Sequence, residues 1–162
     1  MIMSRWWLFG RYRAAMVIGN VLYRNGQHAD AEPYFREVLS LSPTHTGVFR
    51  SHLKSHRSGI LFELLLRCPT TGAMNNLGAI MQPDGDDSRL AEAAELYEGA
   101  LRFPAAHQDK ALLSSFGALL CRPVFKRYEE AAALFSEALE LDPKFEVGKT
   151  NLAWVQRKLT SG

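Results

Sequence analysis

Residues 131–143 read AAALFSEALELDP, and the triplet Phe116-Gly117-Ala118 precedes them. Ala131, Phe135 and Ala138 follow one another at spacings of four and three residues, which places them on one face of a helix. Pro143 comes directly after the last turn, and proline cannot continue a helix because it lacks the N–H and its ring clashes with the preceding turn. The stretch therefore predicts an amphipathic helix that ends at Pro143 and packs on the helix that carries Gly117.

The same pattern occurs twice more in altered form. LGA at 77–79 precedes AAELYEGAL at 93–101, and IGN at 18–20 precedes AEPYFREVLSLSP at 31–43. Gly78 and Gly117 lie 39 residues apart. Internal repetition at such a period indicates stacked supersecondary units, here helical hairpins with short insertions.

Each recurring residue has a packing role in the predicted hairpin. A glycine in a helix interior costs about 1 kcal/mol relative to alanine, so its recurrence indicates a close approach of two helices. We expect the alanines at 31, 93 and 131 to face the glycines at 19, 78 and 117 across each hairpin. We expect the aromatic rings at 35, 97 and 135 to fill the gaps between neighbouring hairpins.

This register resembles the tetratricopeptide repeat (TPR) family, whose unit of about 34 residues is a pair of antiparallel helices. The resemblance implies an all-α, right-handed solenoid of antiparallel helical hairpins. Aligned to the family, the chain divides into an N-terminal apolar and basic extension at 1–11, repeats at 12–45, 71–107 and 109–145, a capping helix at 146–159 and a tail at 160–162.

Residues 46–70 are too few for a full repeat. Ile60 to Pro69 is similar to a second helix with its terminal proline, so we interpret the segment as a degenerate repeat with a shortened first helix. An inserted loop or a splice artefact is the alternative. The consecutive leucines at 64–66 argue against a solvated loop, because they favour burial.

The N-terminal residues 2–11 combine aromatic side chains with arginine. That composition is found in helices that lie in a membrane interface. We expect instead that the segment packs on the first hairpin and covers Trp6 and Trp7.

The composition is that of an ordinary soluble domain, 47% hydrophobic and 22% charged with a net charge of +2. Residues 1–57 carry eight Lys/Arg against three Asp/Glu, which falls short of the basic footprint of a nucleic-acid binder. No apolar run approaches the roughly 18 residues of a membrane span, or the core of a signal peptide. We expect a cytoplasmic protein if the chain is complete.

The chain shows no catalytic or metal-binding signature. GxxxxGK[ST], GxSxG and GxGxxG motifs do not occur. His52 and His56 share a helical spacing but have no third ligand, and Asp84 to Asp87 lacks the terminal glutamate of a calcium loop. Cys68 and Cys121 are too far apart for a zinc or redox motif, so we expect two buried thiols. The expectation is a protein without enzymatic activity, metal or cofactor.

In the family, the first helix of each hairpin lines a concave groove that binds a partner protein or peptide. Carried over position by position, the resemblance implies the groove candidates Arg13, Met16, Asn20, Tyr23, Asn75, Gln82 and Ser114, to which we add Asn76, the neighbour of Asn75. Asparagine amides can both donate to and accept from an extended peptide backbone. For Tyr23 the alternative is packing between helices.

A subset of the family binds the C-terminal carboxylate of heat-shock chaperones through conserved Lys, Asn and Arg side chains. Asn20 and Asn76 match that clamp, whereas Met16, Ala111 and Ser115 do not. We therefore do not expect capture of a chaperone tail.

Two short stretches, MNNLG at 74–78 and KTNLAWVQRKL at 149–159, resemble the C-terminal repeat region of the transmembrane-and-TPR O-mannosyltransferases. Those enzymes modify cadherin-type proteins in the endoplasmic reticulum. This resemblance implies an alternative, a partial repeat module of such a membrane enzyme, located in that compartment. The first expectation is a non-catalytic scaffold that binds a partner peptide or helix in the groove.

Overall fold

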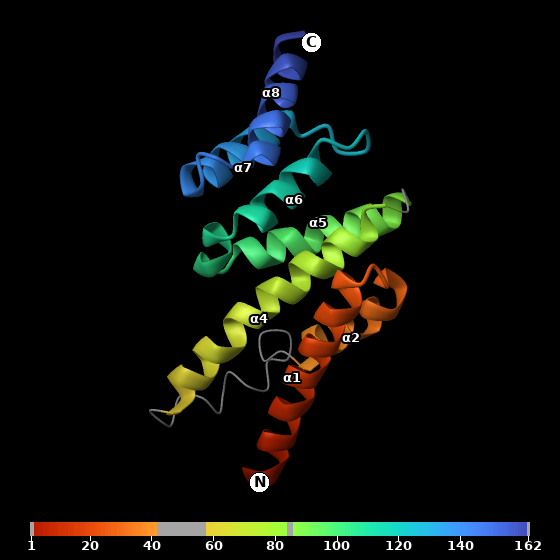
Figure 1. The fold of residues 1–162 in the computed structure, drawn as a ribbon, viewed down its shortest axis with the longest axis vertical. Coiled ribbons are helices and arrows are strands. Elements are labelled where there is room, and N and C mark those ends of the chain that lie inside the picture. Colours follow the sequence, from red (N-terminus) through yellow and green to blue (C-terminus); the bar gives the residue numbers. More distant parts are fainter. Residues whose placement is uncertain (1, 42–57, 84–85, 162) are drawn as a thin grey trace. The chain divides into compact units, whose positions relative to one another are not determined.

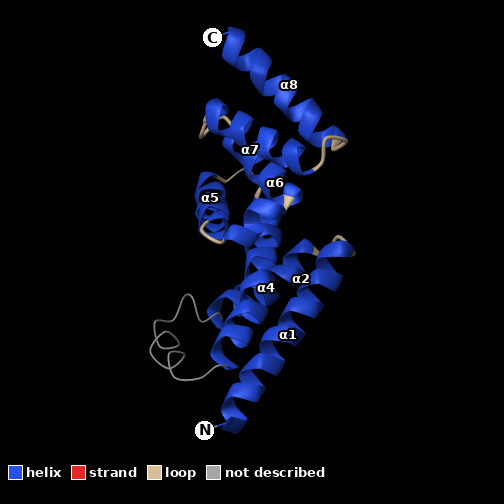
Figure 2. Ribbon diagram, turned by 90° about the vertical axis from the view of Figure 1, so that its left-hand side faces the viewer, coloured by secondary structure: helices blue, strands red, loops and turns tan. Residues whose placement is uncertain are grey.

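The computed structural model describes residues 2–41, 58–83 and 86–161, and within these ranges every regular element is a helix (Figures 1 and 2). The order is α1 (Ile2–Arg24), α2 (His28–Leu41), α4 (Ser58–Met81), α5 (Asp87–Leu101), the short 3-10 helix η2 (Pro104–Gln108), α6 (Lys110–Leu120), α7 (Tyr128–Leu141) and α8 (Glu146–Ser161). The prediction of an all-α fold is confirmed. The chain forms two compact units, Met1–Ile80 and Met81–Gly162.

In the first unit, α1 and α2 form a hairpin and lie side by side (Figure 1). Gly26 adopts a φ of +77°, a conformation that glycine reaches without a Cβ clash, and it ends α1. Ala31 and Phe35 on α2 are fully buried. A Cβ added to Gly19 would lie 3.0 Å from Cε1 of Phe35, so the absent side chain is what lets the ring approach α1.

In the second unit, α6 and α7 form the equivalent hairpin, and α8 packs on α7 (Figure 2). The carboxylate of Asp109 begins α6 by accepting hydrogen bonds from the backbone N–H groups of Ala111 and Leu112. A Cβ on Gly117 would lie 2.8 Å from Cε1 of Phe135. The two hairpins therefore share one packing rule.

This contact between glycine and an aromatic ring differs from the contact between glycine and alanine that the sequence predicts. The atoms nearest to a Cβ at Gly19 and Gly117 belong to the rings of Phe35 and Phe135, not to the alanines one turn earlier. Side chains in a helix point toward its N-terminus, so a long ring covers the turn before its own Cα. The rings of Phe35 and Phe135 therefore fill the space inside their own hairpins where alanine was expected. Tyr97 stacks instead on Phe116 of the next hairpin, as expected for a ring between neighbouring hairpins.

The helix expected to end at Pro69 does not end there. Helix α4 continues across Pro69 to Met81, so residues 58–81 are one element. A proline inside a helix removes one hydrogen bond and introduces strain, but burial can compensate for that cost. Ala73, Leu77 and Met81 in the following turns are each at most 1% exposed. The rest of the expected degenerate repeat, residues 46–57, lies outside the described residues.

Two further expectations about the chain ends need correction. Residues 2–11 continue into α1 as one helix, and Trp7 remains 59% exposed instead of being covered. In α8, the sequence predicts that Val147, Leu152, Val155 and Leu159 cover the last hairpin. Val155 is fully buried, whereas Val147 and Leu159 remain 56% and 39% exposed. Both helices thus expose apolar residues that a sequence pattern assigns to the core.

Candidate functional site

Helices α1 and α4 lie side by side in the first unit (Figure 2). Three contacts between side chains or toward a glycine join them. The Tyr12 hydroxyl and the Thr70 hydroxyl share a buried hydrogen bond of 3.1 Å. One turn on, Cε of Met16 lies 3.3 Å from where a Cβ on Gly72 would be. Because residue numbers rise together along the two helices, α1 and the C-terminal half of α4 run parallel.

The third contact between α1 and α4 joins two groove candidates. Nδ2 of Asn76 donates a hydrogen bond of 2.8 Å to Oδ1 of Asn20, and both side chains are half-buried. Met16 and Asn75 are half-buried as well, and Arg13 is exposed on α1. The structure therefore brings Asn20 and Asn76 together, with the other candidates of the first unit on the same two helices.

Tyr23 lies at the end of α1 with its ring held by aromatic neighbours. It packs edge-on against Phe35, with ring centroids 6.3 Å apart, and against His28 at 5.1 Å. The side chain is half-buried. The Tyr23 ring thus packs between helices, which is the alternative stated for this residue in the sequence analysis. Only the exposed part of its side chain is available to a ligand.

The candidates of the second unit have structural partners. Nε2 of Gln82 donates to the Tyr97 hydroxyl at 3.0 Å and approaches the carbonyl oxygen of Ser115 at 3.5 Å. Arg122 donates to the backbone carbonyl of Gln82 at 2.6 Å. Ser114 is only 6% exposed and offers little surface. Gln82 and Ser114 therefore stabilise the packing of this unit.

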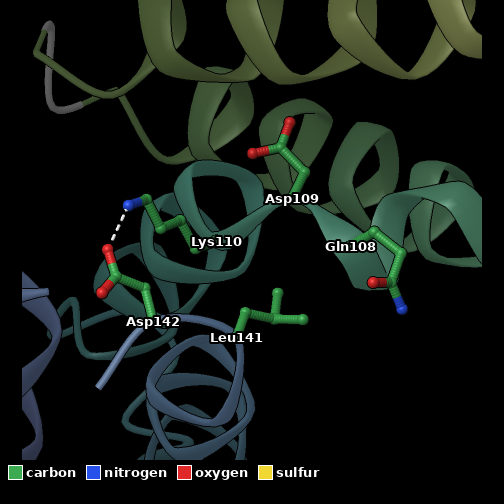
Figure 3. Close-up of a pocket in the computed structure, with 5 residues that line it drawn as sticks. All are labelled: Gln108, Asp109, Lys110, Leu141 and Asp142. Carbon is green, nitrogen blue, oxygen red and sulfur yellow. Dashed lines mark hydrogen bonds and ion pairs between the residues drawn. The ribbon is translucent and has the colours of Figure 1, made fainter. Parts of the chain in front are cut away.

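A hollow of about 730 Å³ lies where η2 meets α6 and α7 ends (Figure 3). Gln108, Asp109, Lys110, Leu141 and Asp142 line it. Lys110 forms an ion pair with Asp142 that joins the start of α6 to the end of α7. The hydrogen bond from Lys110, with a second from the backbone N–H of Lys144, lowers the pKa of Asp142. The carboxylates at this hollow thus serve an ion pair and a helix cap.

His107 links three elements of the second unit. Its Nδ1 lies 2.6 Å from the carboxylate of Glu137 on α7, and its Nε2 lies 3.1 Å from the carbonyl oxygen of Leu101 at the end of α5. Both neighbours are acceptors, so only the protonated imidazolium, with two N–H groups, satisfies both. The hydrogen bond to Glu137 raises the pKa of His107, against a smaller opposing effect of burial.

We expect this link to weaken as the pH rises. A group with a raised pKa in the folded state adds stability that is complete below its unfolded pKa, about 6.5, and is lost through its folded pKa. Urea unfolding at pH 5.5 and 8.5, chosen to bracket about 6.5, should therefore show a larger stability difference between wild type and His107→Gln at the lower pH. The lowered pKa of Asp142 affects stability only in more acidic solution. A difference that does not change with pH would contradict the charged link.

Within the described parts of the chain, no group of three or more His, Cys, Asp or Glu side chains is placed to hold a metal ion. His52, His56 and Asp84 lie outside those parts. Burial raises the pKa of the half-buried Cys121 thiol. The helices that the structure describes include none that is both long and apolar enough to cross a membrane.

Sequence reasoning missed the contacts of His107, Lys110 and Arg127. Arg127 joins Glu98 on α5, at 3.0 Å, to Glu130 on α7. Arg127 and Glu98 lie 29 residues apart in the chain, and His107 and Glu137 lie 30 apart. The spacing of the repeat was the one available signal, because the two residues of each pair lie about one repeat apart in the chain.

Comparisons with known proteins agree with this architecture. The sequence matches the tetratricopeptide repeat over residues 12–45 and again over residues 125–145. The fold is similar to the C-terminal TPR-containing domain of a protein described as an FK506-binding protein of Plasmodium falciparum, with a TM-score of 0.65, 13% identity, and coverage of 95% of this chain and 91% of that chain. The comparison with curated proteins gave no match.

Proposed function

Because the chain is a TPR protein with the fold of a helical-hairpin solenoid, and such repeats form protein–protein interaction modules, we propose that it is a non-catalytic scaffold. Its ligand is a peptide or helix of a partner protein. The binding face is formed by α1 and the C-terminal half of α4, around Asn20 and Asn76. The single observation that supports this face is the hydrogen bond between those two side chains, which places two amides side by side.

The chemistry of the face suits an extended backbone. An asparagine amide has two donors and an acceptor, so a pair joined by one hydrogen bond retains further donors and acceptors. Half-burial lowers the local dielectric and strengthens hydrogen bonds made there. Met16 supplies apolar contact beside the amides, and the exposed Arg13 supplies positive charge. Tyr23 and Asn75 belong to the proposed face as neighbours, whereas Gln82 and Ser114 contribute through packing.

The test removes both amides together, so that neither is left half-buried without its partner. Proteins retained by the immobilised chain are identified, and one is titrated by calorimetry against wild type and the double variant Asn20→Ala with Asn76→Ala. Two ligand hydrogen bonds are worth about 0.5–1.5 kcal/mol each, so we expect affinity to fall by about 5- to 150-fold. The matched control is Asn151→Ala, which removes a half-buried amide from α8.

The proposed binding face is contradicted if the double variant keeps wild-type affinity and an unchanged melting temperature, because the partner then binds elsewhere. Equal losses in the double variant and in Asn151→Ala would likewise contradict it. The likeness to a solved structure supports the repeat architecture alone and gives no support to the O-mannosyltransferase alternative.

A further inference from the structure

Helix α1 has three faces, and two of them are covered within the first unit. Tyr12, Met16 and Asn20 face α4, and Gly19 faces Phe35 of α2. On the third face, Val17, Ile18 and Val21 are 61%, 41% and 52% exposed. With Trp7, Gly10 and Ala14, which are also exposed, they form what we call the outer face of α1.

The outer face is apolar over four turns. Its span from Trp7 to Val21 is roughly 21 Å at about 1.5 Å per residue. A helix that is apolar on every side is normally buried on every side. The exposed residues lie in register on one helix instead of being scattered, which marks an interaction surface.

The equivalent face of α6 is buried, and it shows what kind of element covers such a surface. With Gly19 aligned to Gly117, Ala14, Ile18 and Val21 correspond to residues 112, 116 and 119. Leu112, Phe116 and Leu119 are 0%, 4% and 0% exposed. The ring of Phe116 stacks on Tyr97 of α5, with centroids 5.4 Å apart. In the second unit, the helix that precedes a hairpin therefore lies against this face.

Charge favours the same kind of occupant on α1. Helix α1 carries four arginines and no acidic residue, and the exposed Arg13 and Arg24 lie along one edge of the outer face. Helix α5 is the opposite, with Asp87, Glu92, Glu95 and Glu98 against one arginine. An amphipathic helix with acidic flanks thus complements α1 in both its apolar and its charged parts.

We propose that the outer face of α1 docks an acidic amphipathic helix of a partner protein, in the way that α5 lies on α6. A second copy of α1 fits less well, because self-pairing brings arginine edges together. An anionic membrane also fits less well, since interfacial helices insert bulky Trp, Phe and Leu side chains, whereas this face consists mostly of Gly, Ala and Val. Small residues instead allow close approach of another helix.

The test uses a labelled peptide with the sequence of residues 86–102, DDSRLAEAAELYEGALR, as the acidic helix. Its fluorescence anisotropy is titrated with the full chain. We expect saturable binding that Val21→Glu and, separately, Val17→Glu weaken by about tenfold or more. Val147→Glu is the matched control, because Val147 is a helical valine of similar exposure on α8. A peptide with glutamines at 92, 95 and 98 should bind less tightly, as should the original peptide in high salt.

The alternatives give different results. Absence of peptide binding, or equal weakening by Val147→Glu, overturns the proposal. Self-association seen by light scattering and removed by Val21→Glu, without peptide binding, identifies a second copy as the occupant. Co-sedimentation with phosphatidylserine vesicles but no peptide binding identifies a membrane. The double asparagine variant should bind the peptide normally, which separates this surface from the proposed Asn20–Asn76 face.

Discussion

Replacing Phe135 with alanine is expected to lower the free energy of unfolding by about 3–5 kcal/mol, the usual cost of deleting a buried aromatic ring. The ring is 1% exposed and occupies the space that Gly117 leaves on α6. Its loss leaves a cavity inside the α6–α7 hairpin, which rigid helices fill only in part. Urea unfolding followed by circular dichroism measures the loss. Trp154→Ala is the control, and its loss should be smaller because Trp154 is 40% exposed.

A second substitution tests whether the Phe135 ring occupies the space beside Gly117. In the wild type, Gly117→Ala places a Cβ 2.8 Å from the Phe135 ring, and the resulting strain of about 1–3 kcal/mol exceeds the gain in helix propensity of about 1 kcal/mol. In the Phe135→Ala background the strain is absent, so the same substitution should become stabilising. Additive effects in the double variant would show that the two residues do not meet.

The other large effect is expected from Ala131→Leu, which should destabilise the protein by about 1–3 kcal/mol through overpacking. Ala131 is fully buried on the face of α7 that also carries Phe135. Ala133 lies two residues further on the same helix and is exposed, so Ala133→Leu adds the same atoms without strain. Thermal unfolding should therefore show a lower melting temperature for the first variant alone. Equal melting temperatures would contradict the close packing around Ala131.

The asparagines of the proposed face show which features of the site can be predicted from the sequence. The resemblance identified Asn20 by its position in the first repeat, and Asn76 as the neighbour of Asn75 and a match to the carboxylate clamp. Their mutual hydrogen bond was not predictable, because it joins residues 56 apart across a segment whose length fits no repeat. Tyr23 is similar: its position on α1 follows from periodicity, whereas its contacts with His28 and Phe35 depend on how α2 closes.

The sequence by itself determined the helical class and the pairing of α1 with α2 and of α6 with α7, since the spacing of Gly, Ala and aromatic residues specifies which side chains share a helix face. The tertiary structure alone decided what covers each face. Ile18 and Phe116 occupy the same repeat position and are both apolar, yet they are 41% and 4% exposed. It also decided that α4 continues across Pro69, because the cost of a proline is local whereas the burial that offsets it involves several turns. The periodicity of the sequence describes one helix at a time, whereas stacking depends on contacts between helices that are distant in the chain.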